Sequence, residues 1–187
     1  MSGDGFWVFG YGSLVWRPAI PFDEVWPAVL QGYVRRFHQG SEDHRGVPGR
    51  PGRVVTLLPE SAGEVWGKAF WVPARARARV LARLDVREKN GYVRHQVDLA
   101  LQGPRVRFVQ GLVYMATPEN AHYLGPASPE SIAAQVDRSS GPSGPNDEYV
   151  LRLAAALREM GAQDSHVFEV EAALLALRGQ LPPRPGS

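Results

Sequence analysis

Phe9-Gly10-Tyr11-Gly12-Ser13-Leu14 is a glycine-rich stretch that follows directly on an apolar run, Phe6-Trp7-Val8-Phe9. The run has the aromatic and β-branched residues that favour a buried strand. Glycine permits backbone angles closed to other residues and lets a ligand approach the main chain. Successive backbone N–H groups in such a turn can bind an anion such as a carboxylate. The stretch therefore predicts a strand that delivers a binding loop to a pocket, although most stretches of this kind are only turns.

Two better-known glycine motifs do not fit this loop. A dinucleotide-binding loop needs a third glycine at the position of Val15. A nucleophile elbow needs glycines two residues on either side of Ser13, where this chain has Tyr11 and Val15. The loop therefore predicts neither a nicotinamide or flavin dinucleotide site nor a serine nucleophile.

Length and composition are those of an ordinary globular protein. The chain has 187 residues, of which 44% are hydrophobic and 21% charged. We expect a single domain over residues 1–181, because no linker or repeat interrupts the chain, and a disordered tail at 182–187. No apolar stretch approaches the roughly 20 residues of a membrane span, so no membrane partner is expected.

The absence of cysteine limits the chemistry and fits a reducing compartment. Without cysteine there are no disulfides, no thiolate metal ligands and no cysteine nucleophile. The first residues, Met1-Ser2-Gly3-Asp4-Gly5, lack the basic and apolar regions of a signal peptide. We therefore expect a cytoplasmic location.

The charge pattern does not predict a nucleic-acid partner. The net charge is only +2, and no long basic run is interleaved with aromatic residues. The densest basic group is Arg75, Arg77, Arg79 and Arg83. Their helical spacing favours a solvated helix face over a phosphate-binding patch.

The order of expected elements indicates an α+β fold. Strands are expected at 6–9, 28–38, 53–58, 65–72, 92–101 and 106–115, with a bend at Gly32 and a turn at 61–63. A helix is expected at 74–84, broken from Asp85 onward. Three helices follow, one capped by Ser128, one capped by Asn146 and ending at Gly161, and one over about 164–178. Strands that precede helices predict a strongly bent sheet or small barrel with a helical C-terminal part.

A second candidate for chemistry is Arg87-Glu88-Lys89-Asn90-Gly91-Tyr92, between an expected helix and an expected strand. Rigid elements on both sides can aim a side chain from such a segment into a pocket. As a general base, Glu88 would need a pKa raised by burial, whereas its two cationic neighbours alone would lower that pKa. From the residues alone, a solvated charge cluster is the favoured alternative.

The histidines give no sign of a metal site. The five histidines are His38, His44, His95, His122 and His166. None of these residues has a second histidine or a carboxylate at a spacing typical of metal ligands. The run Asp43-His44-Arg45 could form a small ion-pair network or contact substrate, and the network is the favoured interpretation. No metal site is expected.

Taken together, the motifs resemble those of the ChaC-type gamma-glutamylcyclotransferases, and among them the glutathione-specific type 2 branch. The resemblance runs from Trp7 to about Leu175, with its motifs in order. They are Trp7-Val8-Phe9-Gly10-Tyr11-Gly12-Ser13-Leu14-Val15-Trp16, Asp43-His44-Arg45-Gly46-Val47-Pro48-Gly49, Pro51-Gly52-Arg53-Val54-Val55-Thr56-Leu57, Leu84-Asp85-Val86-Arg87-Glu88-Lys89-Asn90-Gly91-Tyr92, Tyr123-Leu124-Gly125-Pro126-Ala127 and Gly141-Pro142-Ser143-Gly144-Pro145-Asn146-Asp147-Glu148-Tyr149.

This resemblance implies a fold, a reaction and a set of site residues. The fold is a small mixed β-barrel with peripheral helices. The reaction is the intracellular cleavage of glutathione to 5-oxoproline and cysteinylglycine, carried out by a carbon–nitrogen lyase without a cofactor. The family's catalytic glutamate falls on Glu88, and its tyrosine near the pocket falls on Tyr149. The residues implied to hold the gamma-glutamyl group are Val8, Phe9, Gly10, Tyr11, Gly12, Ser13 and Leu14.

Two other functions remain open from the sequence. One is the same cyclisation on other gamma-glutamyl amines or amino acids. The other, of a different class, is a non-catalytic module that binds a small anion. For all three functions the expected partner is a small molecule, which is glutathione for the function that the resemblance implies. No nucleic-acid partner and no membrane partner are expected. We expect the protein to be a monomer or a weak dimer.

Overall fold

The computed structural model describes residues 4–87 and 92–179. The chain forms two compact units, which we call the barrel unit (residues 1–34 and 57–121) and the helical unit (residues 35–56 and 122–187). The chain passes from one unit to the other within two long strands, β2 (Glu24–Ser41) and β3 (Gly52–Pro73). The predicted single domain over 1–181 stays a prediction, and the predicted tail at 182–187 lies outside the described residues.

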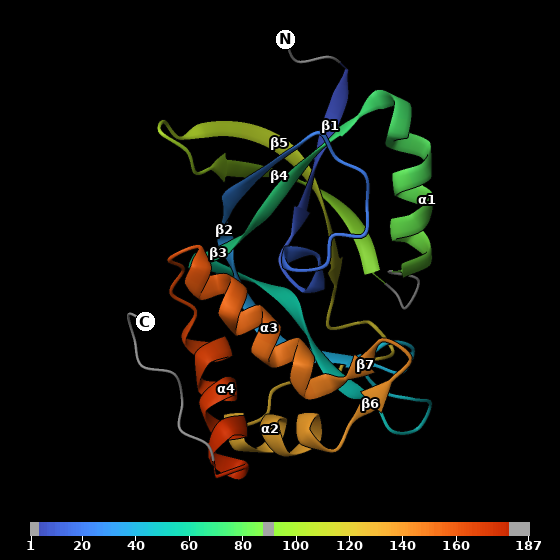
Figure 1. Cartoon of the computed structure of the whole chain (residues 1–187), viewed down its shortest axis with the longest axis vertical. Coiled ribbons are helices and arrows are strands. Elements are labelled where there is room, and N and C mark those ends of the chain that lie inside the picture. The colour runs from blue at the N-terminus through green and yellow to red at the C-terminus, as the bar shows by residue number, and fades with distance from the viewer. Residues whose placement is uncertain (1–3, 88–91, 180–187) are drawn as a thin grey trace. The chain divides into compact units, whose positions relative to one another are not determined.

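The barrel unit is a closed five-stranded barrel in the order β1-β3-β2-β4-β5 (Figure 1). Its other strands are β1 (Gly5–Gly10), β4 (Tyr92–Leu101) and β5 (Arg107–Ala116). Strand β1 pairs antiparallel with β3 and parallel with β5, and β4 pairs antiparallel with β5 along its whole length. The predicted α+β fold with a small mixed barrel is therefore confirmed.

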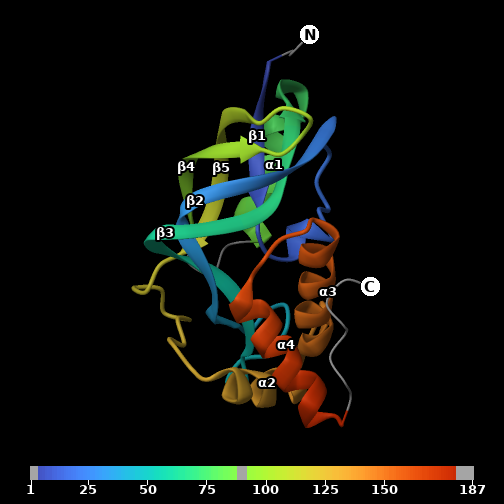
Figure 2. The same cartoon turned by 90° about the vertical axis from the view of Figure 1, so that its left-hand side faces the viewer.

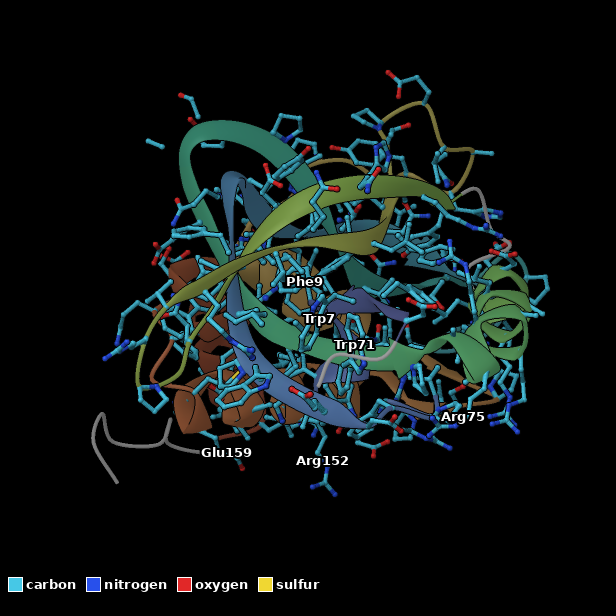
Figure 3. The ribbon with its side chains drawn as sticks, turned by 90° about the horizontal axis from the view of Figure 1, so that it is seen from above. Trp7, Phe9, Trp71, Arg75, Arg152 and Glu159 are labelled. Carbon is cyan, nitrogen blue, oxygen red and sulfur yellow. The ribbon has the colours of Figure 1, made fainter. Side chains whose placement is uncertain are left out.

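Strand β1 is buried on both faces, which explains its nearly continuous apolar sequence. Trp7 and Phe9 lie inside the ring of strands together with Trp71, seen from above in Figure 3. The rings of Trp7 and Trp71 are 5.2 Å apart between centroids. Val8 belongs to a second buried cluster that also contains Val80 and Leu84. The strand that leads into the glycine-rich loop is thus fixed from two sides.

Helix α1 (Arg77–Arg87), preceded by the short 3-10 turn η2 (Ala74–Ala76), covers the outside of the barrel. Its Val80 and Leu84 are fully buried, which confirms the predicted apolar face. The predicted solvated face is also found, because the four arginines at 75, 77, 79 and 83 are exposed. The helix break predicted from Asp85 is wrong, since the helix continues to Arg87. Partners on two strands hold the Asp85 carboxylate and favour this extra turn.

The turn predicted at residues 61–63 is also wrong, because β3 is a single strand of 22 residues. A Cβ atom on Gly63 would lie 2.4 Å from the carbonyl oxygen of Tyr33 on β2. The glycine therefore permits a close approach of two strands and does not mark a turn. The bend predicted at Gly32 fits its φ of 82°, an angle that favours glycine.

The described residues of the helical unit form three helices that pack together, α2 (Pro129–Asp137), α3 (Asn146–Glu159) and α4 (Ser165–Leu177). Figure 2 shows this group, in which α4 contacts both α2 and α3. Two short strands, β6 (Ser140–Gly141) and β7 (Gly144–Pro145), precede α3. The predicted cap of α2 is confirmed, because the Ser128 side chain accepts a hydrogen bond from the N–H of Ser131.

The cap predicted at Asn146 is wrong. Asn146 is the first residue of α3, and Pro145 occupies the capping position. The buried Asn146 amide pairs instead with the main chain of Arg53, accepting from its N–H at 2.7 Å and donating to its carbonyl at 2.9 Å. A short side chain that can both donate and accept is needed for this pairing, which a sequence pattern cannot distinguish from a cap.

Across residues 4–87 and 92–179, no helix combines the length and the apolar character needed to cross a membrane.

His166, on α4, makes the helical unit sensitive to acid. Its Nε2 accepts a hydrogen bond from the N–H of Phe37 at 3.0 Å, so this nitrogen carries no proton in the folded protein. Burial, followed by the charge of Arg36, lowers the pKa of His166 to about 4. Between this pKa and the unfolded value near 6.5, the unfolded chain binds a proton that the folded chain does not. The contribution of His166 to stability is therefore fully present above about pH 6.5 and is lost as the pH falls toward 4.

We predict that the urea midpoint, followed by helical circular dichroism, falls more steeply between pH 6.5 and 4 for the natural protein than for His166→Gln. Glutamine cannot titrate in this range. The matched control is His122→Gln, which removes the imidazole of a half-exposed histidine in the same unit. Equal slopes for the natural protein and His166→Gln would refute this role of His166.

Candidate active site

The glycine-rich loop leaves the end of β1 and turns sharply. After Gly12 the chain forms the 3-10 turn η1 (Ser13–Val15), in which the Val15 N–H donates to the Gly12 carbonyl at 3.0 Å. A Cβ atom on Gly10 would lie only 2.6 Å from the Cβ of Leu14. The loop can fold back on itself in this way because residue 10 has no side chain.

The predicted loop residues differ in what they offer to a ligand. The side chains of Val8 and Phe9 are buried in the core, so any contribution of theirs to binding would come from the main chain. Tyr11 is also buried, with 6% of its surface exposed. Gly12, Ser13 and Leu14 are half-buried. The part of the loop that solvent reaches is therefore the segment from Gly12 to Leu14.

Tyr11 is anchored to β5. Its hydroxyl donates a buried hydrogen bond of 2.8 Å to the main-chain carbonyl of Tyr114. The loop is thus tied to the barrel by a side chain of its own, in addition to the turn of its main chain.

The side chain of Tyr114 makes a second connection, to the last turn of α1. Its hydroxyl donates to Oδ1 of Asp85 at 2.7 Å, and the same oxygen accepts from Nε of Arg94 at 2.9 Å. Arg94 completes a two-pronged ion pair with Oδ2 of Asp85. Arg94 is directly opposite Tyr114 in the β4–β5 register, and its guanidinium is 5.9 Å from the centre of the tyrosine ring. The three side chains form one compact group.

The protonation states in this group follow from its contacts. The hydrogen bond from Tyr114 and the pairing with Arg94 lower the pKa of Asp85. Burial, followed by the Asp85 contact, raises the pKa of Tyr114. The Asp85 contact raises the pKa of Arg94. At neutral pH the group therefore holds a carboxylate, a guanidinium and a neutral phenol that donates its proton.

The predicted base, Glu88, lies outside the described residues, and its role stays a prediction. In the sequence it follows Asp85 by three residues and precedes Arg94 by six.

Tyr149 lies in the helical unit, where it is buried. Its hydroxyl accepts from the N–H of Val55 at 3.4 Å, and its ring packs edge-on against Phe37. The guanidinium of Arg45 is 5.8 Å from the ring centre and donates to Glu148 at 2.9 Å. Arg45 thus takes part in an ion pair, as the favoured interpretation of 43–45 predicts, but with a partner outside that run.

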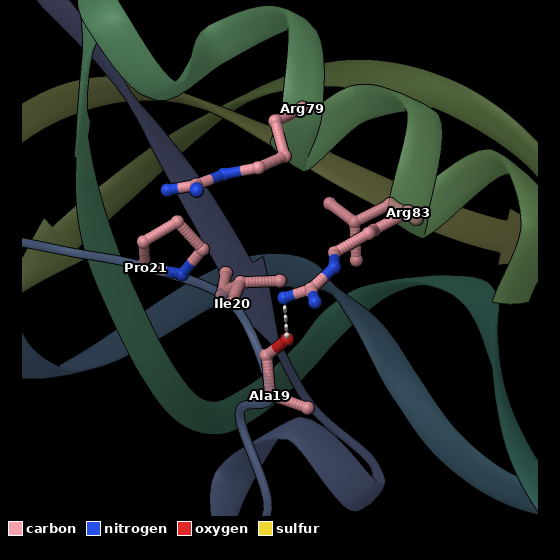
Figure 4. A pocket seen from close by; sticks show the side chains of 6 residues that line it. Ala19, Ile20, Pro21, Arg79 and Arg83 are labelled. Carbon is pink, nitrogen blue, oxygen red and sulfur yellow. Dashed lines mark hydrogen bonds between the residues drawn. The ribbon is translucent and has the colours of Figure 1, made fainter.

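A pocket of about 640 Å³ opens beside α1 in the barrel unit (Figure 4). Its lining combines the apolar Ile20, Pro21 and Leu84 with the arginines Arg79 and Arg83. Arg83 donates to the carbonyl of Ala19 at 3.4 Å. None of the described residues predicted for the site lines this pocket.

Within the described parts of the chain, no group of three or more histidine, cysteine, aspartate or glutamate side chains could hold a metal ion.

Comparison with protein families identifies the chain. The family model described as ChaC-like protein matches residues 6–176. The chain belongs to the ChaC family. Within this family, a zebrafish (Danio rerio) protein named glutathione-specific gamma-glutamylcyclotransferase 1 is 47% identical over 174 residues, covering 91% of this chain and 89% of that protein. A Schizosaccharomyces pombe protein named glutathione-specific gamma-glutamylcyclotransferase is 38% identical, covering 92% and 94%.

A solved structure supports the same fold for this ChaC-family chain. The crystal structure of a yeast gamma-glutamyl cyclotransferase specific to glutathione superposes with a TM-score of 0.88 at 29% identity. The superposition covers 93% of this chain and 97% of the yeast chain. The barrel and the helices therefore follow the architecture of a solved gamma-glutamylcyclotransferase.

The group of Tyr114, Asp85 and Arg94 was not predicted from the ChaC-family sequence. The lengths of β4 and β5 and of the connection between them could have placed Arg94 opposite Tyr114. The contact with Asp85 requires α1 to pack against the outside of the barrel, and no spacing in the sequence predicts that.

Proposed function

We propose that this protein is a glutathione-specific gamma-glutamylcyclotransferase, which converts glutathione to 5-oxoproline and cysteinylglycine. The observation that carries this proposal is the match to relatives with this name over nearly the whole of both chains, at identities up to 47%. The yeast structure, with its TM-score of 0.88, supports the same activity.

The reaction is an internal aminolysis. The α-amine of the gamma-glutamyl group attacks its own gamma-carbonyl carbon, a five-membered ring closes, and the bond to the cysteinyl nitrogen breaks. Nucleophile and electrophile belong to one molecule, so much of the entropy cost of bringing them together is already met, and the protein holds the glutamyl chain in the reactive conformation. Glu88 takes the proton from the amine and returns it to the leaving nitrogen. Neither a covalent intermediate nor a cofactor is required.

The glycine-rich loop is assigned to the gamma-glutamyl group. In this assignment the main chain of Gly10–Ser13 binds the α-carboxylate and stabilises the oxyanion of the tetrahedral intermediate. The main chain of Val8 and Phe9 supports the loop from β1, and Leu14 contributes apolar contact. Tyr149 is proposed to contribute its hydroxyl to substrate binding. We further propose that the reaction takes place in the cytoplasm and that the protein acts as a monomer or weak dimer.

The proposal predicts selectivity for the tripeptide. Purified protein is incubated with glutathione and, separately, with gamma-glutamyl-alanine, and 5-oxoproline is followed by mass spectrometry. We expect kcat/KM to be at least about 100-fold higher for glutathione, because a site built for the cysteinylglycine half leaves polar groups unpaired when that half is missing.

The other outcomes separate the alternative functions. Release from gamma-glutamyl-alanine alone would retain the chemistry and change the substrate. Binding of glutathione without release of 5-oxoproline from either compound would contradict the enzyme assignment and favour a binding module.

A further inference from the structure

Tyr114 is the residue through which the two parts of the proposed catalytic machinery in the barrel unit are joined. One part is the glycine-rich loop, and the other is the end of α1, directly before Glu88. We propose that Tyr114 is a positioning residue: its main-chain carbonyl holds the loop through Tyr11, and its hydroxyl holds the last turn of α1 through Asp85. This inference rests on the proposed function and adds to it a residue that acts through Tyr11 and Asp85.

The connection to the loop is made inside the core. Tyr11 has 6% of its surface exposed and Tyr114 has 7%, and the hydroxyl of Tyr11 reaches the Tyr114 carbonyl at 2.8 Å. A buried hydroxyl without its acceptor would carry the full penalty of desolvation. Movement of β5 at residue 114 therefore moves the start of the loop with it.

The connection to the helix is made by the Tyr114 side chain. Asp85 accepts from the Tyr114 hydroxyl at 2.7 Å while it is paired with Arg94. Asp85 lies in the last turn of α1 and Arg94 in β4, so their ion pair joins the two ends of the chain segment that contains Glu88. The hydroxyl of Tyr114 links the α1 end of this segment to β5, and the pairing of β4 with β5 links the Arg94 end.

Because the ion pair between Asp85 and Arg94 is exposed, we infer that Tyr114 is needed to hold the Asp85 carboxylate in place. The side chains of Asp85 and Arg94 are 42% and 44% exposed, so solvent weakens their mutual attraction. Tyr114 is buried and belongs to the cluster that packs α1 against the barrel. A buried donor on a rigid strand fixes the direction of the carboxylate better than an exposed cation on a flexible side chain does.

The test separates the two connections by single-atom changes. Tyr114→Phe removes the hydroxyl contact with Asp85 but keeps the main-chain carbonyl that binds Tyr11. We expect kcat for 5-oxoproline release to fall roughly 10- to 100-fold, since a small misplacement of a reacting group has an effect of this size. KM should change by less than about threefold. Tyr11→Phe, which releases the loop, should show the converse, with KM raised more than kcat is lowered.

The matched control is Tyr33→Phe on β2, which removes the same atom from a half-buried tyrosine for which no hydrogen bond is found among the described residues. It should retain the natural kcat and KM. A cycle with Asp85→Asn tests whether Tyr114 acts through Asp85. We expect the double variant Tyr114→Phe/Asp85→Asn to lose no more than about twofold in kcat beyond the more damaging single variant, whereas independent losses that multiply would overturn the link.

A second readout does not depend on turnover. Hydrogen exchange of peptides covering residues 85–94 should be faster in Tyr114→Phe than in the natural protein and Tyr33→Phe. Unchanged exchange there, or a natural kcat in Tyr114→Phe, would overturn the positioning role while the proposed function stands. If the natural protein releases no 5-oxoproline, the proposed function fails, and the exchange experiment still decides whether Tyr114 holds this segment.

Discussion

Glu88→Gln should lower kcat for 5-oxoproline release by roughly 10³-fold while the fold is retained. Glutamine has the size of glutamate but cannot take a proton from the α-amine, and general base catalysis typically contributes 10²- to 10⁴-fold. KM for glutathione should change little, because Glu88 acts on the reacting proton and the loop binds the glutamyl group. The measurement is steady-state release of 5-oxoproline, together with circular dichroism of each purified variant.

Glu60→Gln is the matched control for this variant. Glu60 is an exposed glutamate on β3, and its substitution makes the same chemical change away from the loop. It should turn over glutathione like the natural protein. If Glu88→Gln retained the natural kcat, the base would have to be another group, and the assignment carried over from the ChaC-type resemblance would be incorrect.

The second large effect is expected for Gly10→Ala, with a loss of roughly 100-fold in kcat/KM for glutathione. The added Cβ would lie 2.6 Å from the Cβ of Leu14, an atom that cannot move without the main chain of η1. The loop must therefore open, and the main-chain donors assigned to the α-carboxylate are displaced. Enough stability should remain for purification, because overpacking of this kind costs about 1–3 kcal/mol.

Gly111→Ala distinguishes loss of the loop from general overpacking. Its Cβ would approach Cδ1 of Leu99 at 2.4 Å, the far end of a flexible side chain in the same barrel. We expect lower thermal stability and nearly natural kcat and KM. A natural kcat/KM in Gly10→Ala, or an equal loss of kcat/KM in the two variants, would argue against a specific role of the loop in binding.

Patterns in the sequence were sufficient for the elements that depend on local signals. The apolar run before Gly10 predicted β1, the spacing of Val80 and Leu84 predicted the buried face of α1, and the Ser128-Pro129 pair predicted the start of α2. Each of these signals lies within a few residues of the structure it determines. The order of strands before helices was enough to predict an α+β fold with a strongly bent sheet or small barrel.

The predictions that were wrong involve residues whose partners lie far away in the sequence. The local sequence around Gly63 predicts a turn, but the close neighbour of Gly63 is the main chain of Tyr33, which is 30 residues away in the sequence. Asn146 reads as a cap because its partner is the main chain of Arg53. The local sequence at Asp85 predicts the end of the helix, but the Asp85 carboxylate accepts a hydrogen bond from Tyr114 on β5, far away in the sequence. Tertiary contacts of this kind override local propensity, and no local pattern records them.

In the candidate site, too, local features could be predicted from the sequence and long-range contacts could not. The loop residues were predicted from the sequence and from the ChaC-type motifs, and the structure gives the loop a tight turn in which a Cβ atom at position 10 would lie 2.6 Å from the Cβ of Leu14. The connection of that loop to α1 through Tyr114 could not be predicted, because it depends on the closure of the barrel and on the packing of α1 against it.

The most direct test of the central claim is the reaction of glutathione in water enriched in oxygen-18, with both products measured by mass spectrometry. Internal aminolysis predicts 5-oxoproline and cysteinylglycine in equal amounts, with no oxygen-18 in the 5-oxoproline, since water does not take part. Glutamate that carries one oxygen-18 atom, in place of 5-oxoproline, would show hydrolysis of the gamma-glutamyl bond and would contradict the proposed cyclotransferase reaction.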